Sequence, residues 1–286
     1  MSIVGPTSSG KTAVSIDLAK KLKELGITAE IVSADSRQVY IGLNLLSGKA
    51  TRDRVSSKNL KLETKNWYSE GIPHHMLDIV SPKKVYSVAD YKKDAEKIID
   101  EIISRGNLPV LVGGTGFYVD AITKGIVLPE VPPNKELRKK LEKLETKKLL
   151  AILKKLDLVR YREIDQNNRV RIIRAIEIAK SLGKVPKVKA KPKYDVETVY
   201  VDLPDDELKS KIHSRLLARI KAGMINEGEK LHASGVSWKR MEELGLECRY
   251  VALHLQGKIS KKEMIEELEK STWQYVKRQR TWFKRK

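Results

Sequence analysis

A glycine-rich segment near the start of the sequence has the spacing of a phosphate-binding loop. Gly5-Pro6-Thr7-Ser8-Ser9-Gly10-Lys11-Thr12 matches the pattern G-x-x-x-x-G-K-[ST]. Backbone N–H groups of such a loop, the start of the helix that follows it and the lysine ammonium together attract phosphate oxygens. We therefore expect these eight residues to bind a diphosphate, with the Thr12 hydroxyl offered to a bridging magnesium ion.

A carboxylate follows the second apolar run of the sequence. Asp35 lies in Ser33-Ala34-Asp35-Ser36-Arg37-Gln38-Val39-Tyr40, directly after the apolar run 29–32. Ligands of open parallel sheets bind at the carboxyl ends of the strands, so we expect Asp35 to face the phosphate loop. There it could accept a proton from an attacking nucleophile, although a helix-capping or loop role is the alternative.

A third apolar run, Leu108–Val112, ends in Gly113-Gly114-Thr115-Gly116 and not in an acidic residue. Enzymes that hydrolyse ATP usually hold magnesium with an acid at such a position. Its absence counts against an ATP-driven protein, although small-molecule kinases also lack it in some cases. The glycines indicate either a turn or a close approach to substrate.

The elements that position these groups follow from apolar periodicity, which predicts an α/β fold with a parallel P-loop sheet and right-handed crossovers. Strands are expected at 3–4, 29–32, 108–112 and 196–201, and helices at 11–26, 88–103 and 204–232. We assign residues 1–125 and 194–286 to this catalytic core. Residues 126–193 are then an inserted helical domain.

The insertion carries more than half of the excess positive charge of the chain. Residues 134–193 contain 20 Lys and Arg against 7 Asp and Glu, in a chain whose net charge is +20. Such a surplus favours a nucleic-acid partner. Arg169, Arg171 and Arg174 share one helical arc, which is either a solvated face or a phosphate contact. A second cluster near residue 286 interleaves basic and aromatic side chains: Lys277, Arg278, Arg280, Lys284, Arg285 and Lys286 with Trp273, Tyr275, Trp282 and Phe283.

Several other classes of protein are disfavoured by composition. The single cysteine, Cys248, excludes an internal disulfide framework. No apolar run is long enough to span a membrane, and the phosphate-loop motif begins at Gly5, so we expect a cytoplasmic protein without a signal peptide. His74 and His75 are adjacent and lack spaced partner ligands, which favours structural roles over a metal site.

Seven motifs together resemble the tRNA dimethylallyltransferase (tRNA isopentenyltransferase) family, in the family's order and over nearly the whole chain. They are GPTSSGKT, SADSRQVY, GIPHHMLDIV, YSVADY, GGTGFY, RIIRAIE and KRQRTWF. The resemblance implies that the phosphate loop holds dimethylallyl diphosphate. It also implies that the acceptor is the adenosine immediately 3′ of a tRNA anticodon.

The resemblance also implies roles for single residues. Asp35 would be the general base on the adenine amine, and Arg215, with Lys11 and Thr12, would act on the diphosphate. Ser36, Arg37, Gln38 and Thr115 would line the tRNA contact. The anticodon stem-loop would be held by Arg138, Val170, Arg171, Ile172, Ile173 and Arg174. Departures from the family pattern are Lys211 in place of a common arginine, Val170 in place of a polar residue, and Gly245-Leu246-Glu247, which lacks an aromatic residue.

Three alternatives stay open at this point: a P-loop small-molecule kinase, a prenyltransferase acting on free adenine nucleotides, and an RNA-binding protein with a degenerate loop. The basic insertion argues against the first two, and intact Lys11, Thr12 and Asp35 argue against the third. Nothing in the sequence indicates an obligate partner subunit, so we expect a monomer.

Overall fold

The chain folds into two compact units. The computed structural model describes residues 1–53 and 67–284, so Arg285 and Lys286 of the basic cluster lie outside the described residues. Unit 1 consists of Met1–Gly125 and Pro192–Lys286, and unit 2 consists of Ile126–Lys191. Each unit has its own hydrophobic core.

Unit 1 is built on a six-stranded sheet with the order β3-β4-β2-β5-β1-β8. All pairings are parallel except that between β3 and β4. The parallel P-loop core expected from the sequence is therefore confirmed. The strands are β1 (Ser2–Val4), β2 (Ala29–Ser33), β3 (Trp67–Ser69), β4 (Ile72–His75), β5 (Leu108–Gly113) and β8 (Thr198–Tyr200).

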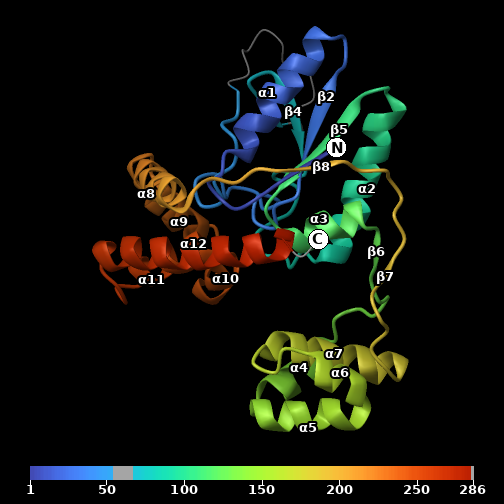
Figure 1. Cartoon of the computed structure of the whole chain (residues 1–286). Helices are drawn as coiled ribbons and strands as arrows, with labels where there is room; N and C mark the ends of the chain where they lie inside the picture. Colours follow the sequence, from blue (N-terminus) through green and yellow to red (C-terminus); the bar gives the residue numbers. More distant parts are fainter. Residues whose placement is uncertain (54–66, 285–286) are drawn as a thin grey trace. The chain divides into compact units, whose positions relative to one another are not determined.

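Helices cover both faces of this sheet (Figure 1). On one face, α1 (Lys11–Glu24) packs against Ile31 and Val110. On the other, α2 (Val88–Ser104) and α3 (Gly116–Thr123) pack against Val32 and Leu111. Neighbouring residues of one strand point to opposite faces, which explains why apolar residues stand side by side in β2 and β5, as at Ile31-Val32 and Val110-Leu111.

A second helical core in unit 1 contains α8 (Asp205–Lys221), α9 (Met224–Ala233), α10 (Trp238–Glu243), α11 (Leu246–Leu255) and α12 (Lys261–Lys284). The single helix expected over 204–232 is wrong, because the chain breaks between α8 and α9. Gly223 has a φ of 103°, a left-handed conformation that a glycine adopts without steric cost. The break turns α9 away from the direction of α8.

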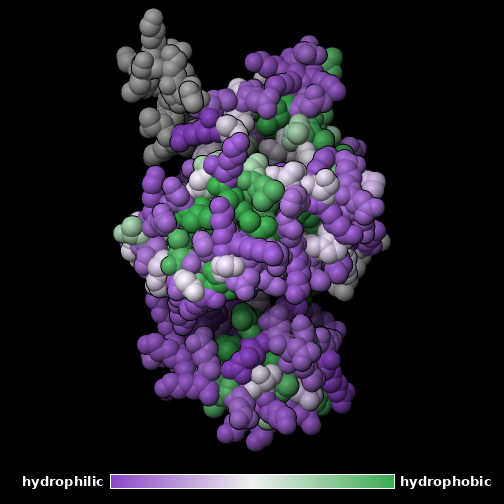
Figure 2. Space-filling view, turned by 90° about the vertical axis from the view of Figure 1, so that its left-hand side faces the viewer, coloured by the Kyte–Doolittle hydropathy of each residue, from purple (hydrophilic) through white to green (hydrophobic). Residues whose placement is uncertain are grey.

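Unit 2 is mostly helical. It contains α4 (Lys135–Glu142), α5 (Thr146–Leu156), α6 (Leu158–Glu163) and α7 (Arg169–Leu182), with a short antiparallel pair of β6 (Ile126–Val127) and β7 (Lys189–Ala190). Leu149, Leu153, Ile172 and Ile176 form the centre of its core. The surface of this unit in Figure 2 is mainly hydrophilic, as expected of a segment with 19 Lys and Arg against 8 Asp and Glu.

Candidate active site

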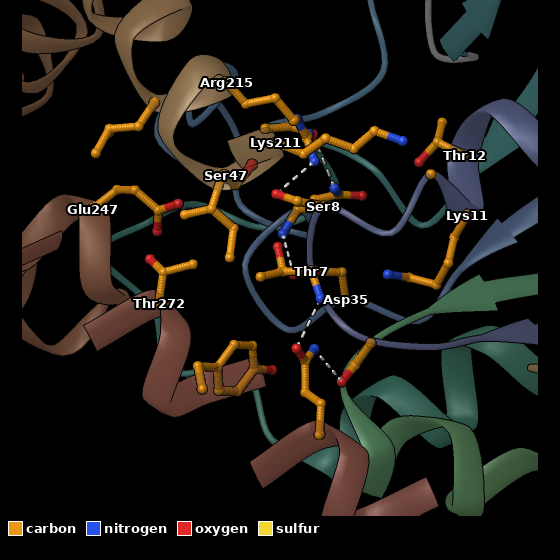
Figure 3. Close-up of a pocket in the computed structure, with 18 of the residues that line it drawn as sticks. Thr7, Ser8, Lys11, Thr12, Asp35, Ser47, Lys211, Arg215, Glu247 and Thr272 are labelled. Carbon is orange, nitrogen blue, oxygen red and sulfur yellow. Dashed lines mark hydrogen bonds between the residues drawn. The ribbon is translucent and has the colours of Figure 1, made fainter. Parts of the chain in front are cut away.

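Three loops meet at the carboxyl edge of the sheet. The phosphate loop follows β1, the Asp35 segment follows β2, and Gly113-Gly114 ends β5, which lies between β1 and β2. This strand order places the three loops side by side, as sequence reasoning expected for Asp35. They line a cavity of about 390 Å³ together with residues of α8, α11 and α12. Lys11, Asp35 and Arg215 approach this space from three different elements (Figure 3).

The phosphate loop is held in a tight arrangement. Gly5 has a φ of 152°, and a Cβ at this position would lie 2.0 Å from the carbonyl oxygen of Val201, so only glycine fits. Gly10, also left-handed, precedes the first turn of α1. Lys11 Nζ donates to the Pro6 carbonyl oxygen at 2.6 Å. The Pro6 carbonyl oxygen therefore accepts a hydrogen bond that Lys11 could instead donate to a bound anion.

Burial lowers the pKa of Lys11 to about 8, although the nearby Asp35 opposes the shift. Removal from water disfavours the charged form of an amine. A diphosphate bound beside Lys11 would restore the lost stabilisation of the ammonium. The environment of Lys11 thus favours an anionic ligand.

Asp35 is fixed by its own backbone. Its Oδ1 accepts hydrogen bonds from the N–H groups of Arg37 at 2.8 Å and Gln38 at 3.3 Å. Burial nevertheless raises the pKa of Asp35 above its ordinary value. An oriented carboxylate whose proton affinity is raised is suited to accept a proton.

The remaining residues predicted around Asp35 lie where two loops join. The Ser36 N–H donates to Thr115 Oγ1 at 3.1 Å, which links the segment after β2 to the segment after β5. Gln38 lines the cavity and accepts from Ser33 Oγ at 3.0 Å, whereas Arg37 is exposed. The structure thus brings Asp35, Ser36, Gln38 and Thr115 together.

Cations of α8 form the opposite wall. Lys211, Arg215 and Arg219 recur every fourth residue, so they lie on one face of the helix, and all three line the cavity. Arg215 Nη1 donates to Ser8 Oγ at 3.2 Å, and burial lowers the pKa of Arg215. Sequence reasoning singled out Arg215 but missed Arg219. The spacing of four residues between them, which puts both on one face of a helix, could have identified Arg219.

Arg219 is positioned by Glu247, which the sequence analysis mentioned only because Gly245-Leu246-Glu247 departs from the family pattern. Its Nη2 donates to Glu247 Oε1 at 2.8 Å, and its Nη1 donates to the Leu45 carbonyl oxygen at 3.1 Å. Glu247 itself lines the cavity. The charge of Glu247 partly offsets the repulsion of Arg215 by Arg219, its neighbour on the same face of α8.

Comparison with known proteins decides the family. The family model described as IPP transferase matches residues 38–286, and the model described as isopentenyl transferase matches residues 1–72. The chain is 39% identical to tRNA dimethylallyltransferase 1 of Syntrophus aciditrophicus, over 99% of this chain and 88% of the relative. The protein belongs to the tRNA dimethylallyltransferase family.

Further relatives agree with this assignment. The tRNA dimethylallyltransferase 2 of Treponema denticola is 38% identical over 99% of this chain and 90% of its own length. The tRNA isopentenylpyrophosphate transferase of Bacillus halodurans has a TM-score of 0.66 at 32% identity and covers 100% of this chain and 86% of its own. A eukaryotic dimethylallyltransferase acting on tRNA, 24% identical with a TM-score of 0.77 over 98% of this chain and 68% of its own, shares the fold. Family membership makes the protein an enzyme and disfavours the kinase, the nucleotide prenyltransferase and the degenerate RNA-binding protein.

The residues predicted to hold the anticodon stem-loop all belong to unit 2, where some are exposed to solvent and others are buried in the core. Val170 is 78% exposed and Arg171 is also exposed, whereas the side chains of Ile172 and Ile173 are buried in the core. Arg138 Nη2 donates to Glu177 Oε2 at 2.7 Å. Their role in RNA binding stays a prediction.

Arg174 makes two internal contacts in the same cluster. Its Nη2 donates to the Val131 carbonyl oxygen at 2.7 Å, and its Nη1 donates to Glu177 Oε2 at 3.3 Å. Arg169 donates to the Leu144 carbonyl oxygen at 2.7 Å, near the end of α4. Of the arginines on the predicted arc, Arg171 is thus the best placed to meet a phosphate.

Only part of the basic and aromatic cluster near residue 286 is exposed to solvent. Arg280 pairs with Asp202 and Asp205, and the Phe283 side chain is 7% exposed. Lys277 and Arg278 are exposed. Arg280 and Phe283 of the KRQRTWF motif therefore fasten α12 to the rest of unit 1, and Arg280 does not offer free charge to RNA.

The two adjacent histidines have structural contacts. His75 Nε2 lies 2.6 Å from Glu30 Oε2, and His74 Nδ1 lies 2.9 Å from the Ile72 carbonyl oxygen. Within residues 1–53 and 67–284, no group of three His, Cys, Asp or Glu side chains is arranged to hold a metal ion. Among the described helices, none is both long enough and apolar enough to cross a membrane.

Proposed function

We propose that the protein transfers the dimethylallyl group of dimethylallyl diphosphate to the exocyclic amine of the adenosine 3′ of a tRNA anticodon, with release of diphosphate. The observation that carries the proposal is the common cavity of Asp35 and Lys11 in a member of the tRNA dimethylallyltransferase family. A base and a phosphate-binding cation that line one cavity suit attack by an amine on a carbon that carries diphosphate.

The chemistry follows from these positions. The adenine amine attacks the allylic carbon, the carbon–oxygen bond to the diphosphate breaks, and Asp35 accepts the amine proton. Negative charge grows on the departing diphosphate. Lys11 and Arg215, which both line the cavity, would stabilise this charge together with backbone N–H groups of the phosphate loop.

Mg²⁺ fits the donors that the loop offers. Mg²⁺ usually keeps several waters and takes one or two protein oxygens together with substrate phosphates, so a site without a carboxylate cluster suits it. Thr12, which lines the cavity, would hold the ion through its hydroxyl. When bound, Mg²⁺ would neutralise part of the diphosphate charge.

The tRNA partner accounts for the charge of unit 2. An adenine stacked in a loop is out of reach of a cavity, so the base has to turn outward before it can react. Cations of unit 2, including Arg171, would hold the backbone of the stem-loop, and Arg37 beside the cavity would contact the RNA at the reacting base. We propose that the enzyme acts in the cytoplasm as a monomer.

One experiment separates this function from its alternatives. The protein is incubated with dimethylallyl diphosphate and, in parallel, with tRNA, AMP or ATP, and the nucleosides are analysed by mass spectrometry. We expect a prenylated adenosine from tRNA alone. Prenylated AMP with unmodified tRNA would instead establish the nucleotide prenyltransferase, and consumption of ATP would establish a kinase.

A further inference from the structure

The side chain of Gln279 joins two of the three loops that line the cavity. It lies on α12 and is 5% exposed. Its Oε1 accepts a hydrogen bond from the N–H of Thr7 at 2.8 Å, and its Nε2 donates to the carbonyl oxygen of Gly114 at 2.9 Å. One amide thus satisfies a donor of the phosphate loop and an acceptor of the loop after β5.

Gly114 is shaped to receive this contact. A Cβ on Gly114 would lie 2.4 Å from Gln279 Nε2, so the amide approaches the backbone more closely than any other residue type at 114 would allow. The glycines after β5, which the sequence left as either a turn or a close approach, therefore include one close approach to a side chain of this chain.

Neighbouring contacts make α12 a firm support for that amide. Arg280 Nε donates to Asp202 Oδ2 at 2.9 Å, and Trp282 Nε1 donates to Asp120 Oδ2 at 3.1 Å. Phe283 is buried in the core that covers one face of the sheet. A side chain on a helix clamped in this way can hold a loop in one geometry.

We infer that Gln279 is a positioning residue, which sets the geometry of the phosphate loop by holding Thr7 against Gly114. The inference rests on the proposed function, because that geometry matters for binding the diphosphate of the donor. Gln279 acts through the backbone of residues 5–12, whose remaining N–H groups must point at phosphate oxygens. Loss of the amide would leave the Thr7 N–H and the Gly114 carbonyl without the partner that each has in the structure.

The test measures pyrophosphate affinity by calorimetry for wild type and for Gln279→Met, which keeps the size of the side chain but removes both hydrogen bonds. We expect binding to weaken about 10-fold or more. Gln274→Met is the matched control, because Gln274 is an exposed glutamine of the same helix, and its affinity should stay within twofold of wild type. A Gln279→Met variant that also stays within twofold would overturn the inference.

Gln279→Glu adds a second measurement, the pH dependence of pyrophosphate affinity, which a merely structural role of Gln279 would not change. Its ionised carboxylate can still accept from Thr7, but its second oxygen would face the Gly114 carbonyl and repel it. Protonation restores a donor, so the ratio of variant to wild-type affinity should rise as the pH falls from 8 to 5. Because the new charge could also repel the ligand directly, the uncharged Met variant decides whether geometry is involved. A ratio that does not change with pH contradicts the inference.

Thermal melts and prenyl transfer complete the design. If Gln279→Met does not fold, Gly114→Ala tests the same contact from the other loop and should weaken pyrophosphate binding similarly. Wild-type protein that binds pyrophosphate but does not prenylate tRNA would refute the proposed function alone. Active wild type with unimpaired Gln279 and Gly114 variants would refute this inference alone.

Discussion

Arg138 of α4 and Glu177 of α7 form a bidentate salt bridge. Arg138 Nε donates to Glu177 Oε1 at 2.8 Å, while its Nη2 donates to Oε2 at 2.7 Å. The Glu177 side chain is only 1% exposed, and it also accepts from the N–H of Asn134 and from Arg174. These bonds hold the pKa of Glu177 below its ordinary value even though burial acts in the opposite direction. The pair is thus a joint within unit 2.

Replacing Glu177 should destabilise unit 2. Glu177→Ala would leave two arginines, each about one-third exposed, without a counter-charge and the Asn134 N–H without an acceptor. We expect the free energy of unfolding to fall by about 1–3 kcal/mol, less than for a fully buried pair because water can still reach the arginines. Urea denaturation measures the loss, and Glu163→Ala, at an exposed position of α6, is the control. Equal stability of the two variants would mean that the joint is unimportant.

Arg171 offers a cleaner test of RNA binding than its neighbours do. Since Arg171 is exposed and Arg174 is engaged internally, Arg171→Ala should weaken tRNA affinity without disturbing unit 2. We expect the slope of log affinity against log salt to decrease by about 0.9 for one lost phosphate contact. Arg171→Lys should keep the slope. Pyrophosphate affinity serves as the internal reference, and a parallel loss of both affinities would show that the substitution acts on folding.

The Lys11 ammonium should give pyrophosphate binding a distinctive pH dependence. The pKa of Lys11 is lowered to about 8 in the free protein, so the charged form prevails below pH 8 and is lost above it. Because diphosphate binds the charged form, affinity should decline by up to about tenfold per pH unit above pH 8. Calorimetry from pH 6 to 10 measures the trend, and Lys11→Met reports the ligand's own protonation. Identical pH profiles for the two proteins would exclude the assigned contact.

The same lysine should be required for the chemical step. Lys11→Ala removes a cation placed to meet charge on the departing diphosphate, so the single-turnover rate of prenyl transfer should drop by about 100-fold or more. A rapid-quench measurement at saturating tRNA isolates this step from RNA binding. A rate close to wild type would remove Lys11 from the mechanism.

Asp35→Asn should separate catalysis from stability. The variant keeps the oxygen that accepts from Arg37 and Gln38 but loses the base, so prenyl transfer should slow by about 100- to 10,000-fold. The wild-type rate should rise as pH climbs through the raised pKa of Asp35, and the variant should lack this rise. Normal single-turnover transfer by the variant would disprove the assignment of Asp35 as the base.

The raised pKa of Asp35 also predicts how Asp35→Asn changes the stability of the folded protein. A carboxyl whose pKa is raised in the folded state stabilises the protein most below the unfolded pKa, and this contribution is lost as pH rises through the folded pKa. At pH 7 the wild type therefore carries the cost of an ionised carboxylate that is partly removed from water. Thermal melts should show the variant as stable as wild type or more so at pH 7, with that advantage disappearing near pH 4.

How far the sequence predicts this structure depends on how local the signal is. The phosphate loop and its flanking elements were predictable, because an apolar strand, two glycines and an amphipathic helix follow each other within about 25 residues. Strands β3 and β4 were missed although Glu70-Gly71, both with positive φ, form the tight turn between them. The break at Gly223 was equally visible in principle, since glycine is unfavourable within a helix.

Contacts between distant segments left no comparable signal. Thr7 and Gln279 are 272 residues apart, and neither the helical pattern of α12 nor the motif around the loop identifies the other as its partner. The interpretation of α12 as a displayed basic cluster failed in part for the same reason, because the acids that neutralise Arg280 lie in another segment, at Asp202 and Asp205. Composition reports charge but not where that charge is compensated.

The hydrogen bond between Thr7 and Gln279 also relates the active site to the order of synthesis. A ribosome makes Thr7 of the phosphate loop 272 residues before Gln279 of α12. A nascent chain that lacks the final turns of α12 carries every residue of the loop, yet the Thr7 N–H and the Gly114 carbonyl still await the amide that joins them. If Gln279 positions the phosphate loop as inferred above, the loop reaches its final geometry only after α12 has been made and has docked.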